Sequence, residues 1–118
     1  MTLEKTLVIS ALSVTCFGLL VTAAIADDTG MSGMHAWQKV GRKTCYADHA
    51  HTGSSNGQKS KKSAMAAAIK DWQEFTAFEY GTDWATFNIA NAKGTSCSQE
   101  ASGWSCTVSA RPCYRKRR

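Results

Sequence analysis

The sequence is short and basic, with 118 residues, a formal net charge of +5, and 14 Lys and Arg against 9 Asp and Glu. This length suits one domain, since domains typically span roughly 50–200 residues. The chain has no nucleotide-binding, metalloprotease or nucleophile motif, so it predicts no catalytic residue and no cofactor. A small hydrolase of unknown specificity stays open as an alternative, because Ser54 and Ser55 lie close to His51 in the sequence.

The first 26 residues have the three-part pattern of a secretory signal peptide. Lys5 places a positive charge ahead of the apolar run 7–21, and Ala24 and Ala26 are the small residues that a signal peptidase reads. The run is shorter than the roughly 20 apolar residues that a membrane-spanning helix needs. We therefore expect cleavage after Ala26, no transmembrane segment in the mature protein, and a periplasmic or secreted location.

Cleavage would remove one of the five cysteines, Cys16, and leave an even number. An even count in a short exported chain indicates a disulfide framework, which small domains need because their core is modest. Four cysteines allow three pairings. We prefer Cys97–Cys106, which would close a hairpin, and Cys45–Cys113, which would tie the first strand to the last. A structural zinc site is disfavoured, because no two of these cysteines have close C-x-x-C spacing.

The mature chain begins with segments of unequal order. Residues 27–34 are rich in Gly, Ser and acidic residues without periodicity, which predicts a flexible leader. Residues 35–49 hold several β-favouring side chains and predict one strand or a pair of short strands. The composition of residues 51–58, dominated by Gly, Ser, Thr and Asn, predicts a loop.

Residues 60–80 carry the clearest pattern in the chain. Apolar residues recur at three-and-four spacing, which predicts an amphipathic helix with Trp72 and Phe75 in the core. Alanines raise the helix propensity, and Gly81 stands where a C-terminal cap is expected. The residues of the predicted buried stripe are Met65, Ala68, Ile69, Trp72, Phe75 and Thr76.

The remainder predicts strands around a turn. Residues 84–92 alternate in a way that suits a strand, although a continuation of the helix after a kink also fits. Residues 99–103 predict a turn and residues 104–110 another strand. We therefore expect a single α+β domain over residues 35–113, with one amphipathic helix on a small antiparallel sheet and two disulfides. Residues 114–118 form a short basic tail, expected to be mobile.

A histidine pair gives the metal-binding alternative. Asp48, His49 and His51 place two imidazoles beside a carboxylate, and in an extended segment both rings project to the same side. Imidazole is a common ligand of zinc and copper. The competing interpretation is that these are solvated histidines in a loop.

Positive charge falls in three places: residues 39–43, residues 59–62 and the C-terminal tail. Lysines in the first turn of a helix oppose its dipole, so they are either a solvated run or part of a site that receives an anion. The predicted anion-binding residues are Lys59, Lys61, Lys62, Arg115, Lys116, Arg117 and Arg118. An anionic envelope component, such as a lipid head group or polysaccharide, or an acidic protein is the expected partner, and nucleic acid is not.

Several segments resemble a group of small exported, cysteine-paired proteins of alphaproteobacteria with no assigned role. They are Ala67–Trp72, Phe78–Gly81, Trp84, Cys97, Trp104–Cys106 and Ala110–Cys113. The resemblance covers most of the mature chain and implies export and paired cysteines. It carries over no catalytic residue. The sequence thus predicts a non-catalytic binding module for an anionic partner.

Overall fold

The computed structural model describes residues 24–116, so most of the predicted signal peptide, together with Arg117 and Arg118, lies outside the described residues. Within that part, two short strands precede a longer one, a single α-helix follows, and a hairpin and a last short strand complete the fold. The elements are η1 (Met31–Met34), β1 (Trp37–Val40), β2 (Lys43–Tyr46), β3 (His51–Gln58), α1 (Lys61–Tyr80), η2 (Thr82–Trp84), η3 (Phe87–Ile89), β4 (Asn91–Glu100), β5 (Gly103–Arg111) and β6 (Cys113–Tyr114). None of the helices in residues 24–116 has the length and apolarity to cross a membrane.

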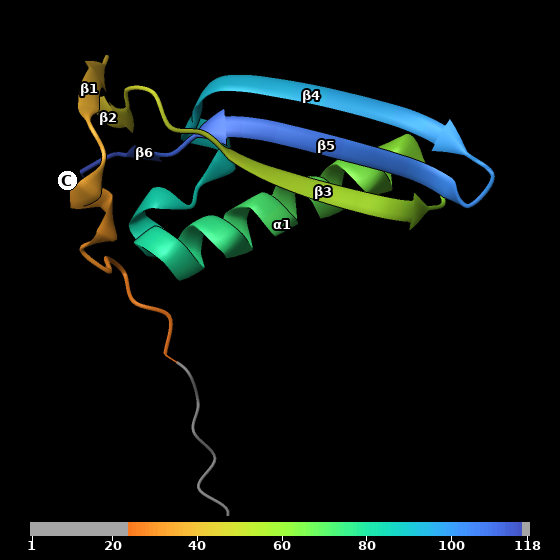
Figure 1. Cartoon of the computed structure of the whole chain (residues 1–118), viewed down its shortest axis with the longest axis horizontal. Helices are drawn as coiled ribbons and strands as arrows, with labels where there is room; N and C mark the ends of the chain where they lie inside the picture. The colour runs from red at the N-terminus through yellow and green to blue at the C-terminus, as the bar shows by residue number, and fades with distance from the viewer. Residues whose placement is uncertain (1–23, 117–118) are drawn as a thin grey trace, which may run out of the picture.

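The strands form two antiparallel sheets instead of the one expected. The larger has the order β3-β5-β4 and the smaller the order β1-β2-β6. Helix α1 packs along one face of the larger sheet, and the smaller sheet stands at the end of the molecule where α1 finishes (Figure 1). The prediction of an α+β fold with one helix on a small antiparallel sheet is confirmed.

Helix α1 has the predicted bounds, but its buried stripe is narrower than predicted. Ser60 caps it, accepting a 3.0 Å hydrogen bond from the Ser63 N–H. The fully buried residues recur at intervals of four, so the contact surface is a narrow row of mostly small side chains: Ala64, Ala68, Trp72 and Thr76. Phe75 falls beside this row and is half exposed, so its predicted place in the core is wrong.

Strand β3 occupies the segment predicted to be a loop. Its buried positions alternate as His51, Gly53 and Ser55, facing α1 in a row without a large apolar side chain. At Gly53 a Cβ atom would lie only 2.7 Å from the Cβ of Trp72, so glycine permits the close approach of helix and strand. Ser55 Oγ donates to Ala64 O at 2.6 Å and accepts from Cys106 N, so its polar group is satisfied in the interface.

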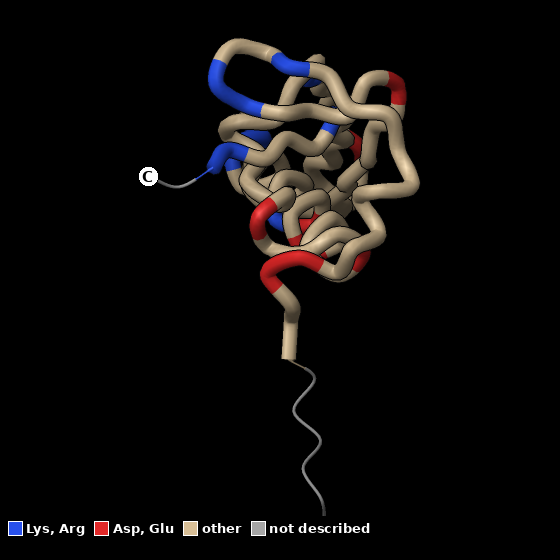
Figure 2. Tube along the Cα trace, turned by 90° about the vertical axis from the view of Figure 1, so that its left-hand side faces the viewer, with Lys and Arg blue, Asp and Glu red and all other residues tan. Residues whose placement is uncertain are grey.

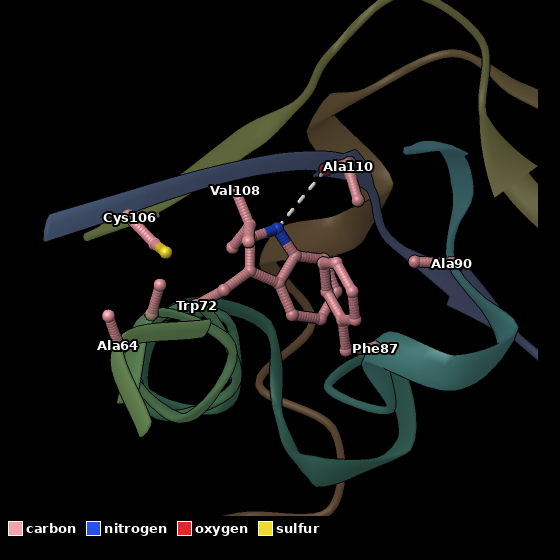
Figure 3. Packing of buried hydrophobic residues seen from close by; sticks show 8 residues of the cluster. Ala64, Trp72, Phe87, Ala90, Cys106, Val108 and Ala110 are labelled. Carbon is pink, nitrogen blue, oxygen red and sulfur yellow. Dashed lines mark hydrogen bonds between the residues drawn. The ribbon is translucent and has the colours of Figure 1, made fainter. Parts of the chain in front are cut away.

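Trp72 is the largest fully buried side chain, and it fills the space between helix and sheet (Figure 3). Its indole Nε1 donates to two strand carbonyls, His51 O at 3.0 Å and Ala110 O at 3.3 Å. The ring of Phe87 meets it edge-on, with centroids 5.2 Å apart. Trp72 thus provides the largest side chain of the core, and its one polar atom is hydrogen-bonded.

Residues 84–92, predicted to be a strand, instead form two 3-10 turns and the start of β4. The turns η2 and η3 carry the chain from the end of α1 back to the sheet, and each buries one aromatic ring, Trp84 and Phe87. The strand-like alternation of this segment thus arises because Trp84 and Phe87 are each buried from a separate turn. The predicted strand over 104–110 and the turn before it are confirmed as β5 and the β4–β5 connection.

Both disulfide predictions are confirmed. Cys45–Cys113 joins β2 to β6 across 68 positions of sequence, and Cys97–Cys106 joins β4 to β5 across 9. Each bridge connects directly opposed residues of neighbouring strands. The first bridge holds the smaller sheet together and the second closes the hairpin.

The predicted flexible leader is corrected, because its residues bond to the end of the helix. Thr29 N donates to Tyr80 O at 3.1 Å, and Asp27 O accepts from Asp83 N, also at 3.1 Å. Ala26 O, in the last residue of the predicted signal peptide, accepts from Thr82 N at 3.1 Å. A helix end and the turn after it leave backbone groups that need partners, and the leader supplies them. Residues 31–34 then form η1 before β1 starts.

Candidate functional site

The predicted anion-binding residues divide between two ends of the molecule. Lys59, Lys61 and Lys62 lie where α1 begins, whereas Arg115 and Lys116 follow β6 near the end of α1 (Figure 1). A helix of 20 residues is about 30 Å long, so the two groups do not form one surface. The tail instead lies beside basic residues of the β1–β2 hairpin.

The strand register explains this second grouping. Lys39 is opposite Thr44, and Thr44 is opposite Tyr114, so one row crosses all three strands. The next row, toward the hairpin turn, pairs Val40 with Lys43, and Arg115 follows Tyr114 directly in the chain. Figure 2 shows Lys and Arg gathered on the side of the molecule where the C-terminus lies. We call this group the basic end: Lys39, Arg42, Lys43, Arg115 and Lys116.

The basic end carries uncompensated charge. In residues 24–116 the ion pair is Lys70–Glu74, and His51, when protonated, would form another with Glu79; neither involves the basic end. All of its members are exposed except Lys43, which is half-buried and donates from Nζ to Ile89 O at 2.6 Å. Four exposed cations are therefore available to an external anion. The sequence shows residues 39–43 to be basic, but their proximity to the tail depends on pairing between β2 and β6.

The lysines at the start of α1 have a different environment. Ser60 and Ser63 form a reciprocal capping box there, which satisfies N–H groups that an anion would otherwise use. Lys61 and Lys62 border an open groove of about 580 Å³ whose other walls, such as Met65 and Ile69, are apolar. The anion-binding prediction for this end therefore loses its helix-terminus argument, and the lysines there are exposed side chains.

The predicted metal residues lie in a packed aromatic cluster. His51 is only 4% exposed, and its ring nitrogens contact Thr76 Oγ1 and Tyr80 Oη, both at 3.2 Å. His49 stacks on His35 with ring centroids 4.2 Å apart and meets His51 edge-on at 5.1 Å. The interpretation of both residues as solvated loop histidines is thus wrong for His51.

This cluster gives no support to a zinc or copper site. Over the part of the chain that the structure describes, no group of three or more His, Cys, Asp or Glu side chains is placed to hold a metal ion. Asp48 is exposed in the connection between β2 and β3, and His51 already uses both nitrogens. The alternative based on Asp48, His49 and His51 is therefore not carried forward.

Burial sets the protonation of the cluster. Desolvation lowers the pKa of His51 below its usual value, although the nearby carboxylate of Glu79 acts in the opposite direction. Desolvation also raises the pKa of Tyr80 to about 12, and the charge of Glu79 adds to that shift. Both groups are accordingly held neutral at physiological pH.

Of the two hydroxyls that lie 3.2 Å from the His51 ring nitrogens, that of Thr76 is committed to the helix. Thr76 is fully buried, and its Oγ1 donates to Trp72 O at 2.7 Å. Its proton is therefore used in a hydrogen bond within the helix, and Oγ1 accepts from His51 Nδ1. Ser55, considered for the hydrolase alternative, is committed to Ala64 O. A nucleophile has to reach a substrate beside its base, and these hydroxyls do not.

Comparison with family models, curated proteins and solved structures finds no match for this chain.

Proposed function

We propose that the protein is an exported, non-catalytic binding module whose basic end docks on an anionic surface of the cell envelope, with lipid head groups as the partner. The observation that carries this proposal is the convergence of two distant basic segments at one end of the smaller sheet, without acidic partners. The Cys45–Cys113 bridge fixes these segments side by side. Disulfides are also what an oxidising compartment allows.

Electrostatics makes such docking measurable. Each basic residue close to an anionic lipid surface contributes about 1 kcal/mol. The exposed members are Lys39, Arg42, Arg115 and Lys116. The attraction falls with salt, because the Debye length shrinks from about 30 Å at 0.01 M to about 8 Å at 0.15 M. A salt-sensitive association that grows with the anionic lipid content is therefore expected.

The test is co-sedimentation of the disulfide-bonded protein with phosphatidylethanolamine vesicles that contain increasing phosphatidylglycerol. In the variant Arg42→Gln/Arg115→Gln/Lys116→Gln, we expect affinity to fall about a hundredfold, since three contacts of about 1 kcal/mol are removed. All three side chains are exposed, so the fold should be unaffected.

The matched control removes the same charge at the other end of α1. Lys59→Gln/Lys61→Gln/Lys62→Gln should retain most of the binding, because those lysines lie remote from the docked surface. Equal losses in the two triple variants would mean that net charge alone drives association. Undiminished binding of the first variant would overturn the assignment of the basic end.

A further inference from the structure

A second feature, of opposite charge character, lies where the smaller sheet meets the end of α1. It is a cavity of about 290 Å³, a size suited to a small ligand. Five separate parts of the chain contribute to it: the leader, β1, β2, η2 and β6. The lining residues are Asp28, Trp37, Thr44, Asp83, Trp84 and Tyr114.

Three aromatic rings form a continuous wall of this cavity. The centroids of Trp37 and Trp84 are 5.4 Å apart, and those of Trp84 and Tyr114 are 5.7 Å apart. Trp84 is 3% exposed and forms the buried part, whereas Trp37 is 52% exposed at the surface. Trp37 Nε1 donates to Ser32 O at 2.9 Å, so this outer ring is held in place without a ligand.

Two carboxylates complete the lining. Asp28 accepts a 2.7 Å hydrogen bond from Gly30 N, which fixes its side chain. Neither Asp28 nor Asp83 belongs to an ion pair within residues 24–116. The negative charge of both groups therefore acts on the cavity, and the faces of aromatic rings add a negative quadrupole.

Packing alone does not account for this aromatic group. Trp84 Nε1, in the wall itself, and Tyr46 Oη, whose ring centroid is 5.0 Å from that of Trp84, are buried with no hydrogen-bond partner among the described residues. Orphaned buried groups are uncommon, and at position 46 phenylalanine would fill the same space without one. Aromatic rings and carboxylates around a small cavity are, in contrast, the elements that recognise an organic cation.

From this geometry we infer that the cavity binds a quaternary ammonium group of the choline type. Such a group has no N–H to satisfy and loses little hydration on entering an aromatic cavity, while its charge is matched by Asp28 and Asp83. Lys39 lies one strand away, opposite Thr44, so a phosphate attached to the ligand would find a cation near the opening. The cavity itself shares no residue with the basic end, so the inference does not require the anionic docking proposed above.

The test is calorimetric titration of the disulfide-bonded protein with choline and with 3,3-dimethylbutanol, its neutral isostere. We expect choline to bind and the isostere to bind at least tenfold more weakly, because only choline carries the charge. Asp83→Asn and Trp37→Leu should each weaken choline binding by about tenfold. Glu100→Gln removes an equal charge at the far end of β4 and should change nothing.

The source of the ligand is distinguished with phosphatidylcholine vesicles. Vesicle binding that free choline displaces assigns the cavity to a lipid head group, whereas choline binding without vesicle binding assigns it to a free solute. The variant with Gln at positions 42, 115 and 116 should bind choline at least as tightly as the parent, so failure of one proposal is separable from failure of the other.

Three results would overturn the inference. The first is absence of choline binding by the folded parent protein. The second is equal affinity for choline and its neutral isostere, which would leave an apolar cavity without charge recognition. The third is binding of a neutral sugar such as glucose that is undiminished in Asp83→Asn while choline does not bind, which would assign the rings to a polyol.

Discussion

Replacing Trp72 by alanine tests the arrangement of helix and sheet most directly. The side chain is fully buried, contacts Phe87 edge-on and donates to the carbonyls of His51 and Ala110. Removing a large aromatic side chain from a packed core costs about 3–5 kcal/mol. Both carbonyls also lose a donor, so we expect the loss near the upper part of that range. Since small domains have about 5–15 kcal/mol of stability, most of it could be lost.

The assay is urea unfolding of the disulfide-bonded variant, followed by circular dichroism. Trp72→Phe separates packing from hydrogen bonding, because it keeps most of the ring and removes the N–H, with an expected loss of about 1–3 kcal/mol. Phe75→Ala is the matched control on the same helix. As Phe75 is half exposed, it should cost no more than about 1 kcal/mol. Equal losses for Trp72→Ala and Phe75→Ala would refute the narrow buried row and restore the wider stripe that the sequence predicts.

Three further predictions concern the cluster behind the cavity and the N-terminus. Tyr46→Phe removes a buried hydroxyl that has no hydrogen-bond partner. The free energy of unfolding measured in urea should therefore stay the same or rise by about 1 kcal/mol, and a clear loss would show that the hydroxyl has a hydrogen-bond partner. Because the pKa of His51 is lowered on folding, the unfolded chain binds more protons than the folded one. The contribution of His51 to stability should therefore be complete above pH ~6.5 and fall as the pH drops below that value. The free energy of unfolding should depend less steeply on pH in His51→Gln, and equal pH dependence in the two proteins would contradict the assignment. Mass spectrometry of the exported protein should give Asp27 as its first residue, and recovery of only an intact Met1 form would contradict cleavage.

Local sequence signals were sufficient for the helix and the disulfides. Ser60 and Gly81 mark the two ends of α1, and the Ala-rich stripe between them sets its buried side. The pairing of Cys97 with Cys106 follows from a turn between two strands. The ends of the helix and this hairpin bridge depend on neighbours within a few residues, which is why the sequence alone can predict them. Cys45–Cys113, across 68 positions, is then the one pairing left for the other two cysteines.

Strand β3 could not be predicted in this way, because its buried positions carry no large apolar residue. Gly53 and Ser55 are typical of loops, yet here they allow α1 to approach and satisfy its carbonyl. Strand preference is largely a matter of fit to a neighbouring surface, and that surface comes from α1 and β5. The alternation of residues 84–92 misleads for a related reason, since Trp84 and Phe87 enter different parts of the core.

The candidate sites depend on tertiary structure even more strongly. Nothing local connects Lys39 to Arg115, which approach each other only after β6 pairs with β2. Likewise, Asp28 and Asp83 meet because the leader bonds to the turn after α1. Composition identified the basic segments, but only the fold shows which of them lie together and that an acidic, aromatic cavity lies beside them.

The nesting of one disulfide inside the other favours one order of oxidation. If the chain is exported N-terminus first, as proposed, Cys45 arrives without a partner, and Cys97 is the next of the four thiols to follow. Bonding in order of arrival would join these two wrongly, and thiol–disulfide exchange would have to correct the error. The β4–β5 hairpin opposes this outcome, because closing its loop of 9 positions costs less entropy than closing the much longer loop from Cys45. Once that hairpin is oxidised, Cys113 is the one partner left for Cys45 among the four.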